Sequence, residues 1–509
     1  MNSYKFTGRL SFRLILFLTG FATFVHFVSY RPSFSKILIG LTVVVIAFYL
    51  IKGQKYRFLK LVLLLIVLFE EVPIQIGQFY RDPGSLNFFG TRTEFSLGLS
   101  PLQLVFLLTI LFVFKEILVN KNNLPPITNK AVLPVLSIIV IGSLTGLPNV
   151  FGSVKFFLTD LMTWIAFLSI FYIVFSLREE GSEKTNGVLN WAKHLYIAKA
   201  NAYLILLSVG RHAHVPGGRL RVFANSTFNT SILFGIFLML ILEQFYAGKD
   251  PKLCFPRGYR LKIGLQSLAL LSAFILQFTL YFQTGQFLIF IISSVYLFWL
   301  VNSRLKVTFV GTASLFLVIL IISSLIVPIY QYVPAYGTIV KEVSTLNIFS
   351  PDSALTRKVE WLNIWNKNIN SYYGLGSLLG QGFGGYFSDT FVRFRSVGIS
   401  AFPTEQLTSR KFYKPHSFFN VLLLKTGLVG LVLYSIFSSW VLLYSARLFR
   451  YYYSRRRGFA FISLVWIMTS LPNILWSLPV NFRYGMLAGI FLAGLINREK
   501  ENCCILREK

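Results

Sequence analysis

Charged side chains are scarce in this chain, and their scarcity excludes an ordinary soluble protein. Asp, Glu, Lys and Arg make up 13% of its 509 residues, against about 25% in soluble domains. Hydrophobic residues make up 55%. Apolar runs of roughly 18 or more residues, long enough to cross a bilayer as helices, recur from end to end. The sequence therefore predicts an all-α fold, a polytopic bundle of transmembrane helices.

Cysteines and clustered metal ligands are also lacking. The three cysteines, Cys254, Cys503 and Cys504, fall in segments predicted to be cytoplasmic, which argues against a disulfide framework and a thiolate metal site. No group of His, Asp and Glu has metal-ligand spacing, so neither a metal nor another cofactor is expected. The net charge is +30, but the basic residues are scattered between the apolar runs. That distribution argues against a nucleic-acid partner.

The apolar runs give about twelve to fourteen predicted spans. They cover residues 10–28, 35–51, 58–78, 96–118, 131–147, 156–176, 189–209, 228–245, 261–281, 286–301, 306–329, 417–446, 459–475 and 479–496. Lys and Arg collect in cytoplasmic loops, and basic residues follow every even-numbered span. Both termini are therefore predicted to be cytoplasmic. The first run lacks a cleavage site and is expected to be retained as a helix.

The chain divides into transmembrane helices over residues 1–329, a long outward-facing hydrophilic loop over 330–415, and further transmembrane helices with a cytoplasmic tail over 416–509. A loop of that length is usually functional. Residues 356–370, TRKVEWLNIWNKNIN, predict an amphipathic helix with Arg357 at its start. Residues 374–387, GLGSLLGQGFGGYF, hold glycines that allow tight turns and close approach of the backbone to a ligand. Phe412 and Tyr413 suit stacking against a sugar, and the alternative is that the loop is a rigid lid with no chemistry.

A histidine and several basic residues are predicted to face the same side of the membrane. His416 ends the long loop, directly behind Lys414 and Pro415. The preceding outer loop, residues 211–231, carries a second polar group whose members are Arg211, Arg219, Arg221 and Asn229. Arginines bind phosphate and diphosphate bidentately. A histidine beside fixed cations suits activation of a hydroxyl and stabilisation of a departing diphosphate. Contact of the arginines with lipid head groups, and a merely hydrogen-bonded His416, are the alternatives.

Three carboxylates fall within or beside the apolar runs. Glu70 and Glu71 lie near the outer end of the third predicted span, and Asp160 lies in the sixth. A carboxylate at membrane depth is costly and is a functional candidate by default. The alternative for each is that it reaches the interface or pairs with a nearby cation.

Four segments of the chain resemble the O-antigen ligase and Wzy-type O-antigen polymerase superfamily of bacterial membrane glycosyltransferases. They are PHSFFNVLLLKTGLVGLV from Pro415, LLGQGFGGYF from Leu378, RKVEWLNIW from Arg357 and RLRVFANSTFN from Arg219. The first is similar to the histidine signature of that family, in which a hydrophobic helix with paired glycines follows the histidine. Together they cover about the C-terminal sixty per cent of the chain.

The resemblance implies a GT-C-like enzyme of the bacterial inner membrane that transfers a glycan from an undecaprenyl diphosphate carrier at the periplasmic face. His416 would be the general base on the acceptor hydroxyl. The residues that would bind the diphosphate and the glycan are Arg211, Arg219, Arg221, Arg357, Lys414 and Asn229. The implied partners are the lipid-linked donor, a glycan or lipid-linked acceptor, membrane lipids, and chain-length regulator or flippase proteins. No metal is implied.

Two departures from the family pattern bear on the reaction. Gln283-Thr284-Gly285-Gln286 stands where members often carry an arginine, and Lys425 stands where they often carry an acid. The missing arginine favours a polymerase over a ligase that transfers polymer to lipid A core or another terminal acceptor. A transporter of a lipid-linked glycan or a small anion such as bicarbonate is the alternative of another class. It would be favoured by broken helices and inverted repeats, and the sequence shows neither. A non-catalytic assembly subunit is the third reading.

Overall fold

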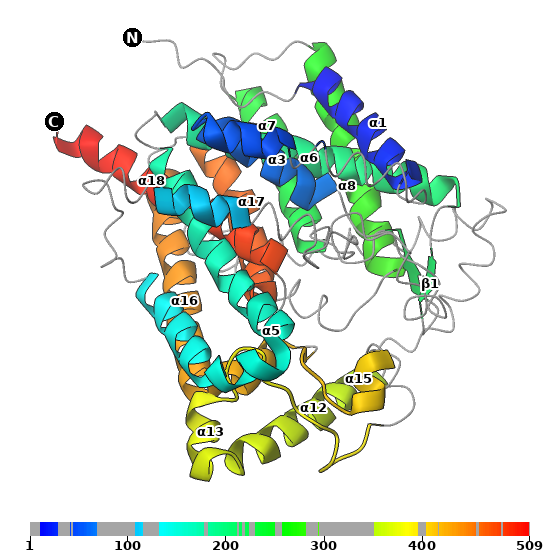
Figure 1. The fold of residues 1–509 in the computed structure, drawn as a ribbon. Coiled ribbons are helices and arrows are strands. Elements are labelled where there is room, and N and C mark those ends of the chain that lie inside the picture. Colours follow the sequence, from blue (N-terminus) through cyan, green and yellow to red (C-terminus); the bar gives the residue numbers. More distant parts are fainter. Residues whose placement is uncertain are drawn as a thin grey trace. The chain divides into compact units, whose positions relative to one another are not determined.

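The computed structural model describes most of the predicted helical segments. It describes residues 11–28, 41, 44–68, 107–115, 132–177, 182–210, 213–215, 219–222, 230–249, 257–280, 294, 351–394, 404–415, 417–454, 458–479 and 482–507. Within these ranges the chain is helical apart from one two-stranded ribbon and a few turns. The helical class that the sequence predicts is therefore confirmed for the described part of the chain (Figure 1).

Four described helical segments are long and apolar enough to cross a membrane. They are Val132–Gly152, Phe156–Ser176, Gly258–Gln277 and Phe418–Phe449. Each overlaps a predicted span, and most of its ends lie within a few residues of the ends of that span. Four shorter apolar segments, Phe12–Phe27, Thr230–Gln244, Leu464–Ser477 and Arg483–Asn497, match further predicted spans. The predicted spans at 286–301 and 306–329 lie outside the described residues except for residue 294.

The described helices belong to two compact units that interleave along the sequence. The first unit holds residues 1–108, 180–348 and 446–473, and the second holds 109–179, 349–445 and 474–509. Each unit is therefore assembled from segments that lie far apart in the chain.

The first unit is built around helix α6. Its elements are α1 (Phe12–Val28), α3 (Lys55–Leu68), α6 (Ser182–Ser208), β1 (Ala213–Val215), β2 (Arg219–Arg221), α7 (Thr230–Lys249), α8 (Arg257–Leu280) and most of α17 (Gly458–Ser477). Helices α1, α3 and α8 all contact α6. Polar bonds fasten these contacts: the Trp191 indole N–H donates to the Lys60 carbonyl at 2.8 Å, and Lys199 Nζ donates to the Val67 carbonyl at 2.5 Å.

The second unit is built around the long helix α5. Its elements are α5 (Val132–Ser176), α12 (Pro351–Ile369), the short 3-10 helix η3 (Tyr372–Gly374), α13 (Leu375–Leu379), α15 (Thr404–Ser409), the first part of α16 (Phe418–Ser454) and α18 (Phe482–Arg507). Helix α18 lies close along α5. A Cβ on Gly485 would fall 2.5 Å from the Thr163 carbonyl oxygen, and one on Gly489 would fall 2.7 Å from the Phe167 carbonyl oxygen. The Asn497 amide donates to the Val174 carbonyl at 3.1 Å.

Helix α5 is too long for one crossing. Its 45 residues would extend about 67 Å if straight, twice the bilayer core. Pro148 lies inside it and has no backbone N–H, which weakens the helix there. In Figure 1 α5, drawn in cyan and teal, bends back on itself beside α16. Leu133, Val140, Leu144 and Leu147 on its first part are each more than half exposed, which fits a lipid-facing surface.

Candidate functional site

Helix α16 is broken where the polar segments of the second unit meet it. Gly427 has φ of 63° and ψ of −158°, outside the helical region. A residue in that conformation stops the regular pattern in which each carbonyl accepts from the N–H four residues later. The carbonyls of Leu424 and Lys425, just before the break, are therefore open to partners from elsewhere. The sequence predicts no broken helix, and the break at Gly427 corrects that prediction.

The glycine-rich turn supplies those partners. The Gln381 N–H donates to the Leu424 carbonyl at 2.6 Å, and the Gly382 N–H donates to the Lys425 carbonyl at 3.1 Å. On the other side of the turn, the Phe383 N–H donates to the Gly142 carbonyl of α5 at 2.7 Å. The turn thus bonds through its backbone to both α5 and α16.

Glycine is required in this turn because helix backbone fills the space that a side chain would occupy. A Cβ on Gly380 would lie 2.6 Å from the Thr426 nitrogen, and one on Gly382 would lie 2.1 Å from the Gly146 nitrogen. Both glycines also have positive φ, 72° and 77°. The sequence suggests close approach to a ligand, whereas the described contacts are with the protein's own helices.

An ion pair closes the junction. Lys425 Nζ lies 2.6 Å from Asp160 Oδ2 and donates to the Gly385 carbonyl at 2.6 Å. The Gly384 N–H donates to the same Asp160 oxygen at 2.8 Å. The Lys425 and Asp160 side chains are 3% and 19% exposed. Of the two readings of Asp160, the structure supports pairing, and the unexpected cation at position 425 is the partner.

A chain of amides fastens α12 and the turn to the start of α16. The Asn368 amide donates to the Leu423 carbonyl at 2.8 Å, and the Gln381 amide donates to Asn368 Oδ1 at 2.9 Å. One turn into α16, the Asn420 amide donates to the Arg357 carbonyl and to Glu360 Oε2, both at 3.1 Å. Amides satisfy both donors and acceptors in such a buried network. The part of α12 around Arg357 and Glu360 is thus held against the first turn of α16.

The predicted catalytic residue, His416, lies outside the described residues, but both of its neighbours are placed. Ser417 Oγ accepts from the Asn420 N–H at 3.2 Å, so Ser417 caps the N-terminus of α16. Position 416 therefore directly precedes the cap, four residues before the side chain that bonds the Arg357 backbone. Arg357 is partly buried and Lys414 is exposed. The structure brings the backbone of Arg357 and the segment after His416 together.

The arginine loop belongs to the other unit. Arg219 and Arg221 form the ends of β2, which pairs antiparallel with β1 in the register Ala213↔Arg221 and Val215↔Arg219. Arg211 and Asn229 lie outside the described residues. Glu70 and Glu71 also lie outside them.

A cluster of lysines and tyrosines, which the sequence analysis missed, lies in the second unit. Lys367 Nζ is 3.6 Å and Lys411 Nζ 5.1 Å from the centroid of the Tyr386 ring. The Tyr413 ring is 5.5 Å from that of Tyr386 and stacks on Phe156 at 3.8 Å with an angle of 7°. We call Lys367, Lys411, Tyr386 and Tyr413 the lysine–tyrosine cluster. These residues share no spacing that would have identified them as neighbours from the sequence.

The cluster is electropositive. Burial, together with the charges of Lys411 and Lys425, lowers the pKa of Lys367 to about 8. A bound anion would relieve this repulsion.

The prediction that Phe412 stacks on a sugar is wrong, since Phe412 is fully buried in a core with Phe387 and Phe394. Tyr413 alone of that pair is partly exposed.

Among the described residues, no three His, Cys, Asp or Glu side chains form a group that could hold a metal ion. Comparison of the chain with protein-family models, with curated proteins and with solved structures finds no match. The function of the site therefore has to be argued from its own residues.

Proposed function

We propose that the protein is a membrane glycosyltransferase that moves a glycan from a polyprenyl diphosphate carrier onto an acceptor sugar hydroxyl. One observation carries the proposal: the Asn420 amide holds the Arg357 backbone against the first turn of α16, whose cap directly follows His416. The backbone of Arg357 is thereby held close to the segment that follows His416, and we assign the base and the cation of the reaction to that end of α16. The reaction needs this pairing, because a proton must leave the acceptor while diphosphate charge develops on the donor.

In this proposal His416 takes the proton from the acceptor hydroxyl. The acceptor oxygen then bonds to the anomeric carbon of the donor sugar as the bond from that carbon to the diphosphate oxygen breaks. The diphosphate, which stays attached to the carrier lipid, leaves with the electron pair of the broken bond. Arg357 and Lys414 are assigned to its negative charge.

The lysine–tyrosine cluster supports an anionic ligand in the same unit. Lys367 is destabilised as a cation by burial and by two neighbouring lysines, and an anion would offset that cost. Partly exposed Tyr386 and Tyr413 add the aromatic surface on which sugars stack. No cofactor is part of the proposal.

A Wzy-type polymerase fits the sequence better than a ligase, because Gln283-Thr284-Gly285-Gln286 lacks the arginine of the ligase-like pattern. The enzyme would lie in the bacterial inner membrane as a GT-C-like bundle of about 12–14 spans. Both termini would be cytoplasmic and the site periplasmic. A chain-length regulator and a flippase are the protein partners that such a polymerase would have.

The broken helix α16 favours a second candidate, a transporter, because transporters bind their substrates at interrupted helices. In this structure, however, the carbonyls freed at the break accept from Gln381 and Gly382, and Lys425 is paired with Asp160. The break therefore serves to hold the glycine turn, which makes the transporter the weaker candidate.

Complementation with His416→Ala, in a strain deleted for the gene, tests the proposal. Surface glycan is run on a gel and the amount of the variant in the membrane is measured alongside. Loss of a general base costs about 100- to 10,000-fold in rate. We expect long chains to vanish while single repeat units stay attached to their acceptor, which is the result for a polymerase.

Two further variants calibrate the result. Arg357→Ala should reduce chain length, whereas Lys358→Ala, its exposed neighbour on α12, should not. Full-length polymer stranded on its carrier in His416→Ala would identify a ligase. An unchanged glycan profile would refute the catalytic role of His416 and put the transporter first.

A further inference from the structure

A cavity of about 350 Å³ lies among helices α1, α3 and α6 of the first unit. Its lining residues are Leu14, Tyr56, Lys60, Lys184, Gly187, Asn190, Trp191 and His194. Cavities of this size are in the range that holds small ligands or head groups. Lys60, Tyr56 and Trp191 are partly exposed, so the cavity communicates with the surface. Nothing in the proposed transfer reaction uses it.

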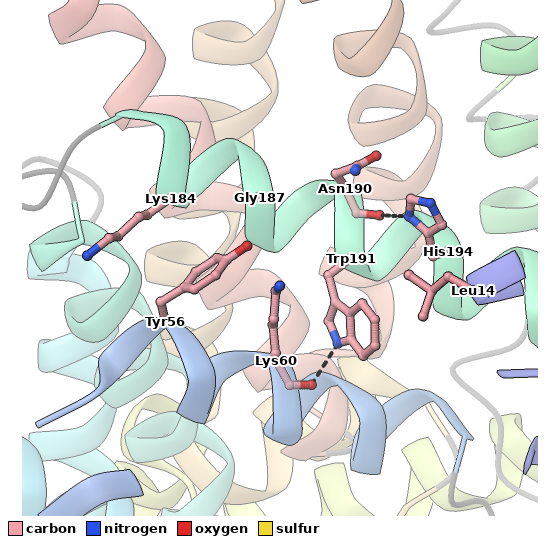
Figure 2. Close-up of a pocket in the computed structure, with 8 residues that line it drawn as sticks. All are labelled: Leu14, Tyr56, Lys60, Lys184, Gly187, Asn190, Trp191 and His194. Carbon is pink, nitrogen blue, oxygen red and sulfur yellow. Dashed lines mark hydrogen bonds between the residues drawn. The ribbon is translucent and has the colours of Figure 1, made fainter. Parts of the chain in front are cut away.

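Lys60 is the central group of this cavity. Its Nζ lies 4.3 Å from the centroid of the Tyr56 ring and 5.5 Å from that of Trp191. Figure 2 shows the Lys60 ammonium between these two side chains, with the Tyr56 hydroxyl directed toward Gly187. A Cβ on Gly187 would fall 2.5 Å from that hydroxyl, so only glycine allows this approach. An ammonium group against ring faces keeps N–H donors for a further acceptor.

His194, by contrast, uses both of its ring nitrogens in hydrogen bonds within and between helices α6 and α1. Its Nε2 accepts from the Ser11 N–H at 3.0 Å, and its Nδ1 lies 2.7 Å from the Asn190 carbonyl. Because a backbone N–H can only donate and a carbonyl can only accept, the ring is neutral with its proton on Nδ1. His194 therefore ties the start of α1 to α6 and brings no charge to the cavity.

The cavity favours an anion. Lys60 brings an ammonium group against the two rings, and none of the eight lining residues is a carboxylate, whereas the Lys184 ammonium points away from Lys60 in Figure 2. Leu14, Tyr56 and Lys184 each lie in the first turn of their helices, α1, α3 and α6, where the helix dipole favours negative charge. The tryptophan and tyrosine are residues typical of the membrane–water interface.

We propose that this cavity is a phosphate-binding site, occupied by the head group of an anionic phospholipid or by a free phosphate compound. The segments before α1, α3 and α6 are the ones that the basic-residue pattern assigns to the cytoplasm, where the leaflet is anionic. Basic pockets between helices at that surface bind anionic head groups. The proposal stands independently of the glycosyltransferase reaction.

The test is native mass spectrometry of the purified full-length protein. Phosphatidylglycerol and phosphatidylcholine are added in equal amounts, and the ratio of their bound fractions is measured. Lys60→Gln should lower the preference for phosphatidylglycerol about fivefold, the contribution of one lysine near an anionic surface. Lys60→Arg should keep it. Lys262→Gln is the matched control, because Lys262 also contacts a ring, that of Phe12 at 5.6 Å, but does not line the cavity.

A second arm separates the two sources. Inorganic phosphate is titrated at constant ionic strength and the melting temperature Tm is followed for the wild type and Lys60→Gln. A Lys60-dependent lipid preference without a phosphate shift identifies the lipid head group. A Lys60-dependent Tm shift without lipid preference identifies free phosphate. If Lys60→Gln matches the wild type in both arms, or Lys60→Arg loses what Lys60→Gln loses, the proposal is overturned.

Discussion

Two buried lysines, one in each unit, are held in different ways. Lys425 of α16 is 2% exposed and Lys199 of α6 is fully buried. Lys199 Nζ donates to the Val67 carbonyl at the end of α3, so it joins two helices. Lys425 Nζ donates to the Gly385 carbonyl and pairs with Asp160, so it joins two helices through a loop. A buried ammonium therefore holds two helices together in each unit, but only Lys425 fixes a turn beside the proposed site.

Helices α6 and α16, which carry these lysines, also differ in how they contact their neighbours: α6 through side chains and α16 through its backbone. Helix α6 runs from Ser182 to Ser208 as a continuous helix, so its contacts to α1, α3 and α8 are made by side chains. Helix α16 is interrupted at Gly427, and its freed carbonyls bond the backbone of the glycine turn. Backbone-to-backbone contact leaves no room for side chains, which makes the second unit the less tolerant of substitution.

Gly382→Ala should have the largest effect, because it inserts a Cβ at 2.1 Å from the Gly146 nitrogen and strains a φ of 77°. Overpacking and the left-handed backbone together should cost about 5 kcal/mol. The control is Gly374→Ala, with φ of 91° and no atom within 4 Å of the added Cβ. It should cost about 1 kcal/mol. Thermal unfolding of the detergent-solubilised variants measures the difference, and equal losses would contradict the backbone contact.

Lys425→Met should come next. It leaves the Asp160 carboxylate without its cation, which should cost about 3 kcal/mol. Lys199→Met removes the donor to the Val67 carbonyl and should cost about 1.5 kcal/mol. Adding Asp160→Asn to Lys425→Met should recover part of the loss, because no buried charge then remains.

The same unfolding measurement on the wild type, Lys425→Met, Asp160→Asn and the variant with both substitutions forms a double-mutant cycle. Strict additivity of Lys425→Met and Asp160→Asn would show that the pair contributes no coupling. A loss in Lys199→Met as large as that in Lys425→Met would remove the distinction between the two units.

Local patterns in the sequence predict the elements of the second unit well. The amphipathic pattern from Thr356 predicts α12, and the structure places that helix at Pro351–Ile369. The glycines from Gly374 to Gly385 predict a turn, and four of them, Gly374, Gly380, Gly382 and Gly384, adopt positive φ. Apolar runs predict the membrane-crossing segments of α5, α8 and α16. In each case the signal lies within about 20 neighbouring residues.

The contacts that join those elements could not be predicted in this way. Asp160 and Lys425 are far apart in the sequence, and neither carries a local pattern that names the other. The break at Gly427 depends on the turn that bonds beside it, so hydropathy alone reads the helix as continuous. Lys367 and Tyr386 meet only because α12 and the turn fold onto the same surface. Long-range pairing of this kind is set by packing rather than by periodicity.

The smallest effect is expected at Lys367, because its ammonium contacts a ring instead of a carboxylate or carbonyl. The effect is also specific, because it depends on pH. Burial, with repulsion from Lys411 and Lys425, lowers its pKa to about 8, below the ordinary 10.5 that it would regain on unfolding. Charged Lys367 therefore destabilises the fold fully below about pH 8. This cost is lost as pH rises from about 8 to about 10.5, because the unfolded chain then binds the extra proton.

Lys367→Met should accordingly be more stable than the wild type at about pH 7, and its advantage should shrink toward about pH 10. Lys358→Met, on the same helix at an exposed position, should show no such change. Removing a neighbouring charge with Lys411→Met should raise the pKa of Lys367 and move the window to higher pH. Melting temperatures of the three variants and the wild type across this range measure the effect. A pH-independent difference for Lys367→Met would mean that Lys367 remains charged, held by the Tyr386 ring as firmly as Lys425 is held by Asp160.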